Sequence, residues 1–227
     1  MHTTKILLGT LLVAASASSF AVNTADLKVI GTIVPSACVP VFTGGDTLNY
    51  GDIGAGTLSP TDFTYLGKRS TSLTLTCDEP TRVAVSSIDG RAGSAPVGLA
   101  PFIGTAIGFA GLGVAHQYGL GLVDGKQVGS YIISLNKTTA LGDGNPVNSF
   151  HSDSLGSTWV DGVFEVAVSD RDRLHSWGAT GTIVPLAYTV IVQPIDVFAG
   201  LNKVADLPDL TDAVPLNGLA AFTVRYL

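Results

Sequence analysis

The residue types that most often do chemistry are sparse in this chain. Beyond the first residues there are three histidines, His116, His151 and His175, and the two cysteines are Cys38 and Cys77. None of these histidines stands in H-E-x-x-H or a similar two-ligand spacing, no serine stands in G-x-S-x-G, and the cysteines form no C-x-x-C pair. The sequence therefore predicts no catalytic residue, no metal site and no cofactor, as expected of a protein that is not an enzyme.

A few residues would suit chemistry if the fold brought partners to them. His151 and Asp153 are spaced so that they would be able to join a metal site, but the pattern favours a histidine in a solvated loop. The alternating charges of residues 170–173 indicate a charged turn, although a pair of carboxylates placed for glycoside hydrolysis leaves no sequence motif. We expect Trp159 and Trp177 to be buried packing residues rather than exposed platforms for a sugar ring.

The first residues have the order of a secretory signal peptide. Lys5 supplies a positive start, Ile6–Ala15 is an uncharged apolar run, and small residues follow through Ala21. This order predicts a signal peptide over residues 1–21, cleaved after Ala21, with a cut after Ala17 as the alternative. A membrane anchor is disfavoured because the apolar run is much shorter than the ~20 helical residues that span a bilayer. We therefore expect the mature chain to be exported.

The overall composition is acidic and poor in charge. With a net charge of −6 the chain has no basic character suited to nucleic acid or anionic lipid, so no nucleic-acid partner is expected. Hydrophobic residues make up 46% of the chain, which is enough for a sizeable core. The 27 glycines and 11 prolines argue against long helices and for short strands joined by turns.

Both cysteines lie in the part of the chain that is expected to be exported. In an oxidising compartment a single pair usually joins, so Cys38 and Cys77 are predicted to form a disulfide. Such a bond closes a loop of about 40 residues and would stabilise the fold by ~4 kcal/mol in the chain-entropy account. Two buried free thiols are the alternative.

Alternating apolar positions recur along the chain, with turn residues between them. No segment keeps a helical period of 3.6 residues, and the clearest alternation, in Ser72–Thr76, is rich in β-branched residues. A turn is expected at residues 78–81. The pattern predicts an all-β fold of short antiparallel strands in a sandwich or barrel. Strands are expected at residues 72–76, 82–86, 130–135, 162–168, 188–193 and 221–226.

Residues 95–115 form a long uncharged stretch. Hydropathy alone would flag this segment as membrane-spanning, but its two prolines and five glycines make it a weak helix. We expect a glycine-rich apolar loop and strand within the exported domain.

Both ends of the mature chain have the pattern of strands. Ala25–Pro35 precedes Cys38 almost directly, and Leu219–Leu227 alternates apolar and polar residues up to a penultimate tyrosine. Together with the cysteine pair, these features resemble the chaperone-usher fimbrial subunits of Gram-negative bacteria, in which an N-terminal extension precedes the first disulfide cysteine. The resemblance covers essentially the whole mature chain. Shorter matches lie at Asn49–Ile53, Ser72–Cys77, Ile88–Gly93, Tyr118–Gly121 and Gly129–Tyr131.

The chain departs from this family in two respects. It is longer than many shaft subunits, so some loops must be expanded. Gly218 also stands closer to the penultimate tyrosine than the glycine of the family's C-terminal motif does, which leaves the register of chaperone recognition open.

The resemblance implies an incomplete fold. Subunits of this family are similar to an immunoglobulin-like antiparallel β-sandwich that lacks its last strand, which leaves an apolar groove with an unpaired strand edge. In this chain it implies a donor-strand extension at residues 22–35 and a pilin-like sandwich domain at residues 36–227. The groove would be filled first by a periplasmic chaperone and then by the next subunit's extension, a known instance of β-augmentation.

The resemblance also implies roles for the two terminal strands. Because side chains alternate along a strand, the donor residues Leu27, Val29, Gly31 and Ile33 would share the face that enters the groove of a neighbouring subunit. An ordinary first strand of the domain's own sheet is the alternative. In the C-terminal strand, the residues that would share one face and contact the chaperone are Phe222, Val224 and Tyr226.

The function that the resemblance implies is structural. We expect a subunit of a surface fimbria, assembled by donor-strand exchange, whose partners are a periplasmic chaperone, an outer-membrane usher and neighbouring pilin subunits. Expanded loops would allow a contribution to adhesion. The alternatives are a fimbria-associated adhesin and a periplasmic binding protein that does not polymerise.

Overall fold

The computed structural model describes residues 27–32, 37–170 and 172–227. The chain divides into two units, residues 1–34 and 35–227. In the first unit, residues 27–32 form neither helix nor strand, and the side chains of Leu27 and Val29 are 92% and 88% exposed. The expected signal peptide, and Ile33 of the expected donor strand, lie outside the described residues.

The second unit is built mainly of antiparallel strands, so the prediction of an all-β fold is confirmed. Short helical segments lie between the strands: η1 (Ala55–Thr57), α1 (Leu99–Ala106), η2 (Val114–His116) and η3 (Val204–Asp206). The strands are β1 (Cys38–Thr43), β2 (Thr64–Thr81), β3 (Val83–Asp89), β4 (Gln117–Gly119), β5 (Leu122–Val123), β6 (Lys126–Gln127), β7 (Gly129–Leu135), β8 (Leu141–Gly142), β9 (Asn145–Ser152), β10 (Glu165–Val166), β11 (Leu174–Ala179), β12 (Tyr188–Leu201) and β13 (Ala220–Tyr226).

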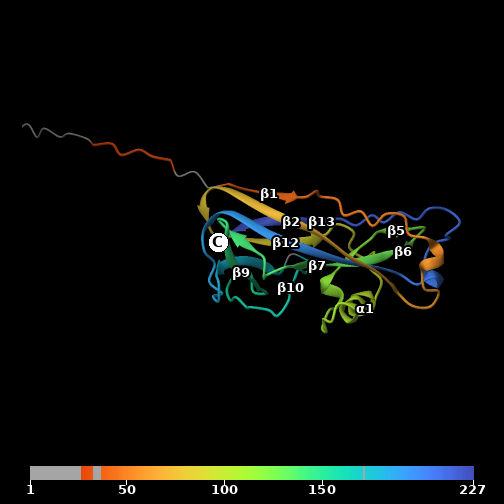
Figure 1. Cartoon of the computed structure of the whole chain (residues 1–227). Coiled ribbons are helices and arrows are strands. Elements are labelled where there is room, and N and C mark those ends of the chain that lie inside the picture. The colour runs from red at the N-terminus through yellow and green to blue at the C-terminus, as the bar shows by residue number, and fades with distance from the viewer. Residues whose placement is uncertain (1–26, 33–36, 171) are drawn as a thin grey trace, which may run out of the picture. The chain divides into compact units, whose positions relative to one another are not determined.

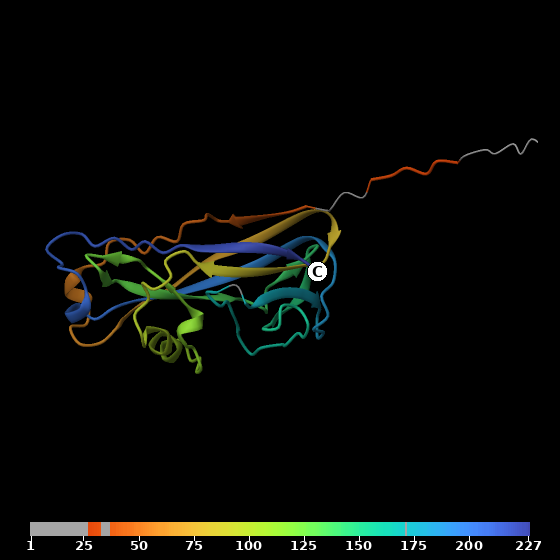
Figure 2. The ribbon, with the colours of Figure 1, turned by 180° about the vertical axis from the view of Figure 1, so that it is seen from behind.

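These strands form two layers in a sandwich-like arrangement. In the first layer β1, β2, β12 and β7 are neighbours in that order, and β4 and β10 pair with β7. In the second layer the order is β9, β11, β3 and β13. The short strand β8 pairs with both β12 and β9, so the layers are continuous at that edge. The long strands β2 and β12 run side by side through the unit in both ribbon views (Figures 1 and 2).

The core lies between the layers and is filled by alternate residues of the strands. In β2, Leu73 and Leu75 are buried, whereas Thr74 between them is only half-buried, as the alternation predicted. Trp177 of β11 is also buried, as expected, and its indole N–H donates a hydrogen bond of 2.9 Å to the side-chain oxygen of Gln193 in β12. This bond satisfies a buried polar pair across the two layers.

Several predicted strands coincide with observed ones, and three predictions need correction. The expected strands at 72–76, 130–135, 188–193 and 221–226 lie within β2, β7, β12 and β13, and 82–86 overlaps β3. Of the expected strand at 162–168 only Glu165–Val166 pairs as a strand. The strands β1, β9 and β11 were not predicted.

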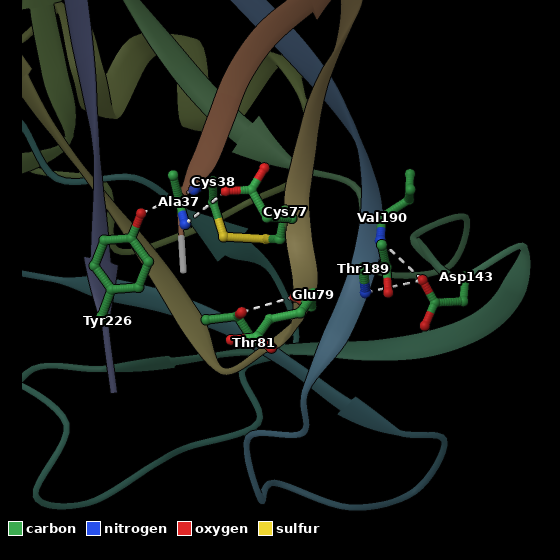
Figure 3. The surroundings of a disulfide bond; sticks show 10 residues. Ala37, Cys38, Cys77, Glu79, Thr81, Asp143, Thr189, Val190 and Tyr226 are labelled. Carbon is green, nitrogen blue, oxygen red and sulfur yellow. Dashed lines mark hydrogen bonds between the residues drawn. A yellow bond between two sulfur atoms is a disulfide. The ribbon is translucent and has the colours of Figure 1, made fainter. Parts of the chain in front are cut away.

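The turn expected at residues 78–81 is wrong, because β2 continues through Thr81. The pairing of β2 with β12 is irregular here, since the register shifts between Tyr188 and Val190. Where the ladder breaks, the carboxylate of Asp143 accepts hydrogen bonds from the backbone N–H groups of Thr189 (3.0 Å) and Val190 (2.8 Å), as Figure 3 shows. This side chain satisfies donors that would otherwise lack a strand partner, so the turn residues are absorbed into a bulged strand.

The loop and strand expected at residues 95–115 are replaced in part by helix α1. This helix begins after Gly98, whose φ of 90° suits glycine, and it buries Leu99, Ala100 and Ile103. Their hydrophobic cluster includes Ile132 of β7, on the face of the first layer that points away from the main core. Burial of an apolar face thus outweighs a weak intrinsic helix propensity. No helix in the described part of the chain is long and apolar enough to cross a membrane.

The predicted disulfide is confirmed. Cys38 and Cys77 face each other in the register of β1 and β2, and their sulfur atoms are bonded, with a sequence separation of 39. Figure 3 shows the bond at the beginning of β1, where the chain enters the sandwich. The bond therefore fixes the first strand of the unit to its longest strand.

Replacing both cysteines by serine should lower the free energy of unfolding by about 4 kcal/mol, because the denatured chain would regain the entropy of an open loop. Denaturant titration of the two proteins under identical conditions measures this difference. Thiol counting on the denatured, unreduced parent protein should detect no free thiol. Two reactive thiols in freshly exported protein would contradict the assignment.

Candidate functional site

The C-terminal strand β13 leaves one of its edges without a strand partner. Along its other edge it pairs with β3 from Ala220, opposite Asp89, to Tyr226, opposite Val83. Among the described residues no strand pairs with the free edge. The backbone groups of that edge are therefore available to a further strand.

The segment that follows β1 faces this free edge. Residues 44–54 form no strand, and the backbone–backbone hydrogen bonds of the described residues 44–58 are confined to the short helix η1. Both ribbon views show this orange segment running along the same side of the unit as β13 (Figures 1 and 2). Side chains engage the carbonyl oxygens of Gly45 and Asn49 and the N–H of Gly51, but neither this stretch nor the free edge of β13 is paired with a strand across the gap.

Between these stretches lies a groove with a cavity volume of about 1230 Å³. Its floor consists of buried apolar residues of β7 and β12, which are Tyr131, Ile133, Ile195, Val197, Ala199 and Leu201. Gly218 lies beside the floor, where a side chain would come within 2.7 Å of the Tyr131 ring. The groove therefore reaches down to the core of the sandwich.

The walls of the groove are apolar side chains that the chain itself does not fully cover. Each is half-buried and packs against the edge of the main core. One wall contributes Leu48, Tyr50, Ile53 and Leu58, and the other contributes Leu210, Val214, Leu216, Ala220 and Phe222. A contiguous apolar surface of this kind, bordered by unpaired backbone, is typical of a site that binds an extended peptide.

The structure places the three predicted residues of the C-terminal strand along one strand with different surroundings. Phe222 lines the groove and contacts Phe42 of β1 edge-on, with ring centroids 5.6 Å apart. Val224 packs against the main core. Tyr226 is 55% exposed, and its hydroxyl accepts a hydrogen bond of 2.8 Å from the backbone N–H of Cys38 (Figure 3). Their role in chaperone contact stays a prediction.

The predicted donor residues lie in an exposed segment. Leu27 and Val29 are exposed, and no atom lies within 4 Å of the position that a side chain on Gly31 would occupy. Ile30, which alternates with them, is 80% exposed. The described part of this segment forms no strand, and its three large apolar side chains, those of Leu27, Val29 and Ile30, are exposed.

A buried cluster of ionisable residues was not predicted. His151, expected in a solvated loop, instead lies in β9 and is 8% exposed, because β11 pairs with it on one side and Val160 bridges to it on the other. Its Nδ1 is 2.9 Å from Oε2 of Glu165, and Nδ1 of His175 is 3.2 Å from the same oxygen. The expected charged turn is also more structured, since Arg173 forms two hydrogen bonds with the carboxylate of Asp153.

The surroundings of this cluster shift its pKa values. Burial alone would raise the pKa of Glu165, but the hydrogen bond with His151 and the nearby imidazole of His175 lower it below the usual range. Burial lowers the pKa of His175, and the nearby carboxylate of Glu165 opposes this only in part. Among the described residues no group of three histidine, cysteine, aspartate or glutamate side chains is arranged to hold a metal ion.

Comparison with known proteins relates this chain to relatives along nearly its whole length. Residues 27–132, which include the exposed segment and both cysteines, match a family described as "Protein of unknown function (DUF1120)". The chain is 29% identical to "Protein GltF" of Escherichia coli strain K12 over 238 residues, covering 94% of this chain and 93% of that protein. It is 25% identical to "Uncharacterized protein YhcF" of the same strain over 244 residues, covering all of both chains. Neither name refers to a fimbria, a chaperone or an usher.

The hydrogen bond between the Cys38 backbone and the Tyr226 hydroxyl allows a test of whether it stabilises the position of β13 beside β1. Tyr226→Phe keeps the ring but leaves the backbone N–H of Cys38 without its acceptor, which should lower the free energy of unfolding by about 1 kcal/mol. Tyr188→Phe is the matched control, because the Tyr188 hydroxyl makes no hydrogen bond within the described part of the chain. Denaturant titration compares the two variants. Equal stability in both would show that this hydrogen bond contributes nothing.

Proposed function

We propose that this chain is a structural subunit of a surface fimbria, with an incomplete immunoglobulin-like sandwich that is completed by a strand from a neighbouring subunit. The observation that carries the proposal is the groove between β13 and residues 44–58, with apolar walls, an apolar floor and unpaired backbone on both sides. The matched family is described only as of unknown function, so the proposal depends on the groove and on the resemblance of the terminal strands.

The groove supports this proposal because one extended strand would both pair with its unpaired backbone and cover its apolar floor. The backbone of an added strand would pair with the free edge of β13 on one side and with residues 44–54 on the other. Its alternate side chains would cover the apolar floor. A small ligand would cover apolar surface without satisfying the row of backbone groups.

The exposed segment before Cys38 has the properties of that strand. Leu27, Val29 and Ile33 would supply apolar side chains on one face, and each would contribute roughly 1.5–3 kcal/mol if fully buried. Gly31 on the same face would allow the donor backbone to approach the floor closely. The Lys28 side chain would point to solvent.

The remaining partners follow from the same reasoning. A chain whose groove is empty exposes apolar surface and an unpaired edge, both of which favour aggregation. We therefore propose that a periplasmic chaperone occupies the groove and contacts Phe222, Val224 and Tyr226 until an outer-membrane usher exchanges it for the next subunit's extension. In this proposal the chain acts as a fimbrial subunit only after its export to the cell surface.

A binding role is the second candidate, and a specific cleft favours it. This cleft has a volume of about 510 Å³ and lies beside α1, on the outer face of the first layer. Aromatic rings of Tyr65, Phe109, Phe164 and Phe198 line it, with polar side chains at its margin. Aromatic walls with a few polar groups are typical of small-molecule sites, so adhesion by an assembled subunit is compatible with the main proposal.

A peptide of residues 25–34 tests donor-strand exchange. It should bind a chain that lacks residues 22–35 and raise its free energy of unfolding, because it would complete the sandwich. Binding is measured by calorimetry and stability by denaturant titration. A peptide with Val29→Asp should bind about 100-fold more weakly or worse, since an unpaired carboxylate would be buried.

The matched control is the same peptide with Ile30→Asp, which places the carboxylate on the opposite face of the strand. It should bind almost as well as the parent peptide. If both variants bind like the parent, or if the parent does not bind, the donor-strand assignment is wrong. If only Ile30→Asp fails, the segment inserts by its other face.

A change in the groove wall tests the acceptor. Ile53→Asp in the shortened chain should weaken binding of the parent peptide at least tenfold, because the carboxylate would have to be buried beneath the added strand. Val39→Asp, an exposed position on β1 outside the groove, is the control. A cooperative denaturant transition in each variant shows that the protein has folded. Equal affinities for the two variants would place the peptide elsewhere.

A further inference from the structure

The buried cluster of Glu165, His151 and His175 joins the two layers at a point away from the groove. Glu165 belongs to the two-residue strand β10, which pairs with β7 of the first layer. His151 and His175 face each other in the register of β9 and β11 in the second layer. The Glu165 side chain is 0% exposed, so its carboxylate meets both imidazoles inside the protein. None of the three residues lines the groove.

The carboxylate of Glu165 also holds the loop that leads to it. Its Oε1 accepts a hydrogen bond of 2.9 Å from the backbone N–H of Gly162, and Lys137 donates one of 2.7 Å to the Gly162 carbonyl oxygen. His151 exchanges backbone hydrogen bonds with Val160 of the same loop. Residues 153–164 are therefore attached to both layers through groups that surround one ionised carboxylate.

The two histidines are not equally satisfied. His151 Nδ1 shares a hydrogen bond with Glu165 Oε2, whereas Nδ1 and Nε2 of the buried His175 have no hydrogen-bond partner in the described part of the protein. Outside the cluster, Asp153 lies 3.8 Å from Nε2 of His151, and it is itself paired with Arg173. The strand positions opposite Glu165 and His175 on the flanking strands are occupied by the apolar residues Leu135 and Val85.

This arrangement tolerates one positive charge but not two. Glu165 is the carboxylate close to both imidazoles, and Asp153 beside His151 is already paired with Arg173, so a second proton would leave an unbalanced charge in a buried site. The more distant His116 interacts with Arg173, Asp153 and Asp170, and neither His116 nor Asp170 is among the groups that act on Glu165. Proton uptake would then favour a state in which the imidazoles reach water.

We propose that this cluster is an acid-operated latch, in which proton uptake by the buried His175 releases β10 and residues 153–164 from the second layer while the rest of the sandwich stays folded. The released element is poorly anchored, since β10 contributes only two residue pairs to the sheet. It also forms part of the wall of the cleft beside α1, through Val163, Phe164 and Val166. Acid would therefore open that cleft and leave the groove unchanged.

The direction of the pH dependence follows from the two shifted groups. His175 has a lowered pKa when folded, so below about pH 6.5 the opened state binds more protons than the closed state, and acid favours opening. Glu165 also has a lowered pKa when folded, so its stabilising contribution is lost as pH falls below the usual range of a glutamate. Both groups favour opening at low pH and closure at neutral pH.

Hydrogen exchange of the full exported chain between about pH 7.5 and about pH 5 tests the latch. Exchange rates are corrected for the intrinsic effect of pH and compared between residues 160–168 and residues 188–201 of β12. The opening constant of residues 160–168 should rise about tenfold per pH unit for each proton taken up, while that of β12 stays nearly constant. A flat profile, or a parallel rise in both segments, would overturn the proposal.

Variants identify the groups that take up the proton. The double variant His175→Gln/His151→Gln should reduce the rise in the opening constant of residues 160–168 between about pH 7.5 and about pH 5 at least tenfold. The variant His116→Gln changes a half-buried histidine outside the cluster and should leave this rise unchanged. Glu165→Gln removes the balancing charge, so opening should move to higher pH. If the double variant fails to fold, the parent's segment-specific profile and Glu165→Gln still decide the question. An unchanged slope in the double variant, or no shift in Glu165→Gln, would overturn the latch.

Discussion

The unpaired edge of β13 is the constraint on which the rest of the molecule depends. Backbone donors and acceptors must find partners, and here one row of them borders an apolar groove that no described strand fills. The side chains around it, including Tyr50, Ile53 and Phe222, are consequently held half-buried. In the proposed assembly, such a domain would reach its lowest free energy only with a strand from another subunit, so its stability would depend on association.

The interior holds a second deficiency of a different kind. At the groove the missing partners are backbone groups and apolar contacts, whereas at the cluster of Glu165, His151 and His175 the deficiency is one of charge. An added strand would supply the partners that the groove lacks, whereas the number of bound protons would set the charge of the cluster. Because the two regions share no residue, the proposed filling of the groove by a neighbouring subunit would leave the cluster able to open.

Sequence reasoning succeeded where alternation and burial coincide. Ser72–Thr76 has β-branched and apolar residues in strict alternation, and it lies within β2. It failed at β9, because Asn148, Ser149 and His151 are buried there among polar neighbours and produce no apolar pattern. Helix α1 was missed because Pro101 and Gly104 within it, and the glycines around it, obscure its apolar face. The C-terminal strand that forms one wall of the groove was predicted, but the residues of the opposite wall show no periodic pattern of apolar positions. The pairing of His151 with His175 depends on the register of two strands and leaves no local pattern in the sequence.

The position of the disulfide has a mechanical consequence. Cys38 is the first residue of β1, and it is bonded to β2, which pairs with β12 along most of its length. A tensile load applied to the residues before Cys38 would therefore pass through a covalent bond into the long central strands. Those strands would be loaded along their axis, in shear across many hydrogen bonds at once, instead of β1 being peeled away one bond at a time. Reduction of this bond would redirect the same force onto the six residues of β1.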